Sequence, residues 1–251
     1  STFTSAATTT TSSTTDMTES TTDTGSEAET AVGEGDGDGD GDGDGDTGGH
    51  EYAATIYLNF DGAELTAGTD DARMDTTQIM EQAGTLEPYD ATGMGDMHLY
   101  IAQEIANDFA AYDVEIVIER PTEGDYTMIV ITPTNNVDSG ISGTGPQDCD
   151  NTNPNNIGFA FFSSESTQTT NAQAASIARI IGFTLGFNQV VMSADIMSAS
   201  NAVPNPSFVD QCFAFNTPPG TCLTQHSPHC PDGEQNSHAA LLALFGEAPM
   251  P

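Results

Sequence analysis

The stretch SIARIIGFTLGFNQVVMSADIMS, residues 176–198, is the one around which we expect the fold to be organised. Apolar residues recur at four-residue steps on one face of a predicted helix: Ile177, Ile181 and Leu185. Gly186 is expected to end this helix, because glycine is the usual residue just past a helix C-terminus. The stretch therefore predicts a buried helix, a glycine break, a short loop and a tight turn that carries Met197.

In outline, the stretch resembles the active-site segment of the metzincin zinc proteases. That family has the pattern H-E-x-x-H-x-x-G-x-x-H and, downstream, a turn with a methionine under the metal. The resemblance is carried by GFTLGFN at 182–188 and DIMS at 195–198, which places Met197 in the turn. With Gly186 on the family's glycine, the three zinc-ligand positions and the general-base position fall on these residues: Arg179, Phe183 and Gln189, and Ile180.

These four substitutions remove the chemistry of the family. Catalytic zinc needs about three N, O or S ligands and an open position for water. Arg179 stays protonated and Phe183 has no donor atom, so only the carbonyl oxygen of Gln189 remains. Ile180 cannot accept a proton from water. The sequence therefore predicts an inactive homologue with no catalytic residue, no bound zinc and no other cofactor.

The resemblance implies an α+β fold of the zincin type, in which a twisted mixed sheet packs on two main helices. Residue patterns predict strands at 55–60, 114–118, 126–132 and 157–162, and helices from 96 to about 111, from 170 and at 239–245, with a short helix at 76–83. Thr170 and Gln173 are expected to form a capping box. In the family, the strand before the active-site helix is the edge that pairs with substrate peptide, which here is 157–162.

Composition divides the chain of 251 residues. Residues 1–50 are rich in Ser and Thr and then in alternating Asp and Gly, so they predict a disordered low-complexity stalk, followed by a metzincin-like domain at 51–251. One register of the Asp-Gly run matches the spacing of a calcium loop: Asp40, Asp42, Asp44, Gly45 and Glu51. Because an alternating run satisfies most of that spacing in several registers, a solvated acidic linker is favoured over a calcium site.

The charge of the chain limits its partners. The chain has 38 acidic residues against three arginines, a formal charge of −35, which excludes nucleic acid and anionic membrane surfaces. An unidentified protein or surface remains as the partner, with divalent cations as an alternative. No apolar run approaches the roughly 20 residues that a membrane span needs. Because the sequence begins at Ser1, we expect a processed, secreted or surface-attached form, with a lipid anchor at the removed leader as a variant of this prediction.

The four cysteines are an even number in loop-like sequence: Cys149, Cys212, Cys222 and Cys230. In an exported protein this predicts two disulfides, with three pairings open and Cys222–Cys230 as the favoured local pair. The rival interpretation is a zinc site made of both residues of that pair together with His226 and His229.

The favoured function is that of a pseudoprotease with a binding or structural role. The first alternative is a hydrolase whose metal site is relocated to His226 and His229. The second is a calcium-dependent adhesive or assembly module that acts through the Asp-Gly run. In the favoured case, Phe183 fills the space of the zinc ion above Met197, and Arg179 reaches solvent or a carboxylate.

Overall fold

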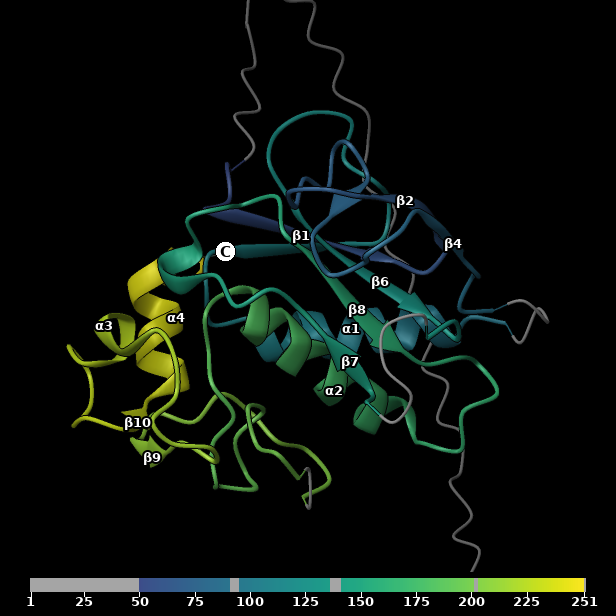
Figure 1. The fold of residues 1–251 in the computed structure, drawn as a ribbon. Coiled ribbons are helices and arrows are strands. Elements are labelled where there is room, and N and C mark those ends of the chain that lie inside the picture. The colour runs from purple at the N-terminus through teal and green to yellow at the C-terminus, as the bar shows by residue number, and fades with distance from the viewer. Residues whose placement is uncertain (1–49, 91–94, 136–140, 201–202, 251) are drawn as a thin grey trace, which may run out of the picture. The chain divides into compact units, whose positions relative to one another are not determined.

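The computed structural model describes residues 50–90, 95–135, 141–200 and 203–250. These residues form an α+β fold with a mixed five-stranded sheet and four α-helices (Figure 1). They belong to one compact unit, Gly48–Pro251. The predicted stalk at 1–50 lies outside the described residues except for His50, and the Asp-Gly register at 40–51 lies outside them from Asp40 to Gly45.

The main sheet has the strand order β5-β1-β6-β8-β7. Its first four strands are parallel, and they confirm the four predicted segments: β5 (Val114–Val117), β1 (Ala54–Asn59), β6 (Thr127–Thr132) and β8 (Ile157–Phe161). The prediction that 157–162 is the edge is wrong, because a fifth strand, β7 (Gly143–Thr144), pairs antiparallel with β8. A two-residue strand in a Gly- and Asn-rich loop leaves no alternating pattern to detect.

The two faces of the sheet are covered by different elements. Because side chains alternate along a strand, Ile56 and Leu58 of β1 contact one hydrophobic cluster and Tyr57 contacts the other. The first cluster contains α1 (Met97–Phe109) and α2 (Thr170–Thr184), which pack against each other on one face (Figure 1).

A small three-stranded sheet with residues in the second cluster was not predicted. It consists of β2 (Ala63–Ala67), β3 (Thr76–Thr77) and β4 (Gly84–Leu86) in the order β3-β2-β4. The short helix predicted at 76–83 is therefore wrong. Its first two residues pair with β2 instead, so a tertiary contact overrides a weak local preference.

Helix α2 begins at Thr170, as predicted, but its capping residue lies one position before the expected one. Its N-cap is Thr169, whose side chain accepts a hydrogen bond from the backbone N–H of Ala172 at 3.3 Å. The predicted capping box of Thr170 and Gln173 is not formed. The Gln173 side chain is fully buried and accepts a hydrogen bond from the hydroxyl of Tyr89 at 3.1 Å.

The described residues after α2 have little regular structure. They contain β9 (Phe213–Ala214), α3 (Leu223–His226), β10 (Glu234–Gln235) and α4 (Ser237–Phe245), and β9 pairs with β10. The short 3-10 helix η1 (Cys149–Asn151) lies before β8. Among the described residues, no helix is both long and apolar enough to cross a membrane.

Two disulfides are present, as predicted. They join Cys149 to Cys222 and Cys212 to Cys230, so the favoured local pair Cys222–Cys230 is wrong. The rival zinc site is wrong for the same reason, because disulfide sulfur atoms are not thiolate ligands. Sequence spacing cannot rank the three pairings. Cys222 and Cys230 each bond a cysteine of another segment, and only the folded chain brings these segments close.

Candidate functional site

Gly186 ends the turn that follows α2, and a residue with a side chain does not fit at this position. Its φ is +85°, in the left-handed region that glycine adopts at little cost. A Cβ at this position would lie 2.4 Å from Oε1 of Gln225 and 2.9 Å from the backbone oxygen of Asp148. The helix end thus packs closely against α3 and against the residue before η1. The N–H of Phe187, the next residue, donates to the Gly182 carbonyl at 2.9 Å.

Met197 lies fully buried against Gly182 of α2. A Cβ on Gly182 would approach the Met197 sulfur to 2.3 Å, so the missing side chain makes room for the methionine. The turn is held by the buried carboxylate of Asp195, which accepts hydrogen bonds from the N–H groups of Met197 at 2.8 Å and Val209 at 3.1 Å and from the hydroxyl of Ser237 at 3.1 Å. Burial raises the pKa of Asp195, and these three hydrogen bonds oppose that shift.

Arg179 and Phe183 form the accessible stripe of α2. From residue 173 to the end of the helix, all residues except these two are buried. Because they are four residues apart, the two lie one turn apart on the same face. Ile180 lies elsewhere: it is buried between the helix and the sheet, where a Cβ on Gly143 would approach its Cδ1 to 2.1 Å.

A pocket of about 280 Å³ adjoins the end of α2. It is lined by Gly145, Gln147, Phe183, Phe187, Asn188, Gln189 and Thr217. None of these side chains is ionisable, although residues 51–251 carry 26 acidic residues and three arginines, a formal charge of −23. Phe183 packs against the main core cluster but stays only partly buried. The expectation that it fills the space of a zinc ion stays a prediction.

Most of the amide groups around this pocket are held in place by hydrogen bonds. The Asn188 side chain bonds Thr221 three times: its Oδ1 accepts from the backbone N–H at 2.8 Å and the hydroxyl at 3.0 Å, and its Nδ2 donates to the carbonyl at 2.8 Å. Gln147 donates from Nε2 to the carbonyl of Phe187 at 3.1 Å. The Gln189 side chain has no hydrogen-bond partner among the described residues. The pocket therefore offers a ligand the side-chain amide of Gln189, whereas hydrogen bonds within the protein hold the amides of Gln147 and Asn188 in place.

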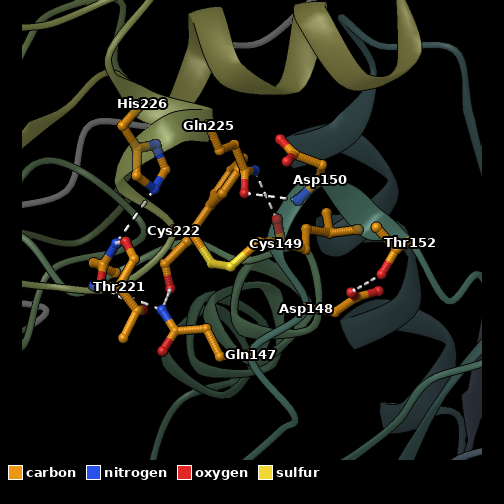
Figure 2. The surroundings of a disulfide bond; sticks show 12 residues. Gln147, Asp148, Cys149, Asp150, Thr152, Thr221, Cys222, Gln225 and His226 are labelled. Atoms are coloured by element: carbon orange, nitrogen blue, oxygen red, sulfur yellow. Dashed lines mark hydrogen bonds between the residues drawn. A yellow bond between two sulfur atoms is a disulfide. The ribbon is translucent and has the colours of Figure 1, made fainter.

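The disulfide between Cys149 and Cys222 joins two sides of this region (Figure 2). One side carries Gln147 and the other carries Thr221, each two residues or fewer from a half-cystine. Gln225 adds a second link, because it donates to the Leu185 carbonyl at 2.8 Å and accepts from the Asp150 N–H at 3.0 Å. The pocket is thus preformed by covalent and hydrogen bonds that reach across the chain.

Arg179, which the predicted alignment places at the first ligand position, pairs with no carboxylate of the described residues. It donates to the backbone oxygen of Ser198, next to the methionine turn, and to the hydroxyl of Ser176 at 3.4 Å. Burial lowers the pKa of this guanidinium. The expectation that Arg179 reaches solvent or a carboxylate is met in part, since it is half-buried and bonded to a carbonyl.

His226 is buried beside two aromatic rings, and its Nε2 lies 3.2 Å from Nδ2 of Asn188. It is 2% exposed, and its ring centroid lies 5.9 Å from that of Phe187 and 5.8 Å from that of Phe215. Burial lowers its pKa to about 4, and the backbone of Gly186 opposes this shift. Within the part of the chain that the structure describes, no three His, Cys, Asp or Glu side chains are grouped so that they could hold a metal ion. His226 and His229 are therefore not joined there by a third ligand.

Sequence reasoning placed two pocket residues, Phe183 and Gln189, at site positions and included two more, Phe187 and Asn188, in the stretch 182–188. It missed the remaining three. Gly145, Gln147 and Thr217 belong to segments for which no helix or strand was predicted. The one usable signal was Cys149, because a disulfide half beside Gln147 ties that loop to another part of the chain. Neither the protein-family models nor the curated proteins include a match to this chain.

Proposed function

We propose that this chain is a non-catalytic, metzincin-like protein that binds an extended peptide segment between strand β7 and the end of α2. The observation that carries the proposal is the preformed, uncharged pocket lined by Phe183 and Gln189, two of the three former ligand positions. A site without catalytic residues or metal ligands that keeps a preformed cavity is suited to binding a ligand.

Three features support the metzincin-like framework. The glycine turn follows the helix at Gly186, the methionine turn lies against the same helix at Gly182, and an antiparallel strand closes the sheet beside it. The zinc that the family would hold does not fit these residues. Arg179 bonds the Ser198 carbonyl and Phe183 has no donor atom, so Gln189 alone could offer an oxygen.

Strand β7 supports an extended ligand. It is the last strand in the order of the described sheet, so one of its edges has no neighbouring strand there. Gly143 and Gly145 let the strand lie close to α2, since a Cβ on Gly145 would already be 3.0 Å from Thr184. A peptide that adds to this edge gains main-chain hydrogen bonds and places alternate side chains on the helix side, where the pocket lies.

The two disulfides fit an extracellular setting, because such bonds persist in oxidising compartments. Secretion, surface attachment and a lipid anchor stay predictions. The relocated hydrolase and the calcium-dependent module also stay predictions, and no contact among the described residues favours either.

The test fills the pocket. A Gln189→Trp variant should lose binding to randomised peptides that the parent retains, because the indole occupies the cavity. Val191→Trp is the matched control, since Val191 is 60% exposed and lies two residues away outside the pocket lining. The proposal is wrong if both variants bind like the parent, or if the parent cleaves these peptides.

A further inference from the structure

Arg179 differs from the other two arginines of the chain in having no acidic partner among the described residues. Arg73 bonds Asp71 at 3.1 Å and Arg120 bonds Asp75 at 2.8 Å. With 26 acidic residues from Glu51 onward, an arginine without a carboxylate is the exception in this domain. This exception, Arg179, lies beside the proposed binding site of the peptide.

The guanidinium of Arg179 keeps unused donors. A guanidinium has five N–H groups, and the carbonyl of Ser198 and the hydroxyl of Ser176 use only two of them. Half-burial without a counter-ion is costly for a charge, whereas a carboxylate can bond the guanidinium with two parallel hydrogen bonds. The residue is therefore equipped to take an anion from outside the chain.

The position of Arg179 connects it to the pocket. It lies one helical turn from Phe183, which lines the pocket, and the two residues are the accessible stripe of this part of α2. A turn of helix rises about 5.4 Å, less than the span of two extended residues. A peptide with one side chain in the pocket therefore brings a group one or two residues away to Arg179.

We propose that Arg179 binds a carboxylate of the peptide held beside β7, supplied either by its C-terminus or by a single Asp or Glu side chain. The inference rests on the proposed function. The charge of −23 on residues 51–251 repels anions at long range, so a peptide with many acidic residues is disfavoured. One carboxylate, held in place by the other contacts of the peptide, meets the local positive charge.

The experiment uses three libraries of acetylated, randomised hexapeptides, none with Asp or Glu at the random positions. The first ends in a free carboxylate, the second in a carboxamide, and the third in a carboxamide with one fixed glutamate. The parent protein should bind its best ligands from the first or third library about ten- to a hundredfold more tightly than the best from the second. If the tighter ligands come from the first library, the carboxylate is the C-terminus of the peptide; if they come from the third, it is an acidic side chain.

Variants separate recognition from a structural role. Arg179→Gln should bring carboxylate ligands down to the affinity of the carboxamide ligands and leave the latter unchanged, which also shows that the variant is folded. Arg179→Lys should keep part of the preference, because it keeps the charge but loses the paired hydrogen bonds. Arg73→Gln removes the same charge from an exposed, paired arginine and should keep the full preference.

Three outcomes overturn the inference in different ways. If the parent binds the three libraries equally, peptide binding stands and carboxylate recognition by Arg179 is wrong. If no library binds at all, the proposed function fails and the inference fails with it. Loss of both carboxylate and carboxamide ligands in Arg179→Gln would assign the residue a structural role only.

Discussion

Gly182 is the residue on which the contact between α2 and Met197 depends. Gly182→Ala places a methyl group 2.3 Å from the buried sulfur, and we expect it to destabilise the protein by about 1–3 kcal/mol despite the better helix propensity of alanine. Gly68→Ala is the matched control, because its nearest neighbour would be Thr76 at an ordinary 3.5 Å. Urea unfolding measures both. Equal stabilities of the two variants would show that Met197 moves aside freely.

His226 should make stability depend on pH. Its folded pKa of about 4 lies below the unfolded 6.5, so the unfolded chain binds more protons between these values and stability falls as the pH drops from 6.5 to 4, by at most about 1.4 kcal/mol per unit. Asp108 acts in the opposite direction, because burial raises its pKa to about 7. The folded chain then binds more protons between pH 3.8 and 7, so the stability that protonated Asp108 contributes is lost as the pH rises through this range.

The two contributions are separated by variants. His226→Phe should flatten the loss of stability on acidification, and Asp108→Asn should steepen it, when urea unfolding is measured at about pH 7 and pH 5. An unchanged pH dependence in His226→Phe would mean that the ring is protonated in the folded protein at pH 5.

The two disulfides should differ in what they contribute to the fold. Cys149–Cys222 spans 73 residues and Cys212–Cys230 spans 18, so replacing the first pair by serine should cost about 1 kcal/mol more on loop-entropy grounds. It should also weaken peptide binding, because it releases Gln147 and Thr221 from each other. Thermal unfolding of the two double variants tests the order. A larger loss from the shorter loop would contradict it.

At the scale of elements, sequence reasoning was reliable where periodicity is strong. The four parallel strands and the helices α1, α2 and α4 were predicted because apolar residues repeat at periods that survive without tertiary information. The shorter strands were missed, since two to five residues with little alternation form strands only through their partners: β2, β3, β4, β7, β9 and β10. Part of the pocket was missed for the same reason: three of its seven lining residues, Gly145, Gln147 and Thr217, come from loops near distant cysteines.

For the whole molecule, charge is the dominant property. A formal charge of −23 on residues 51–251 means that carboxylates repel one another at low ionic strength. We expect the melting temperature to rise as salt increases from a few millimolar, because the Debye length falls to about 10 Å at 0.1 M. Sodium chloride and tetramethylammonium chloride should act alike if screening is the cause. A melting temperature that stays constant over this range would show that the acidic residues are too far apart to matter.

The central claim is that α2, the Gly186 turn and Met197 keep the arrangement of a metzincin site whose ligands were replaced. The most direct measurement is zinc titration, by calorimetry, of a variant with Arg179→His, Ile180→Glu, Phe183→His and Gln189→His. A variant with the first three changes but Gln189 retained is the control, matched in stability by circular dichroism. The account predicts one zinc per chain in the quadruple variant, with clearly weaker binding in the control and in the parent. A folded quadruple variant that binds zinc no better than the control would contradict the alignment and the family resemblance with it.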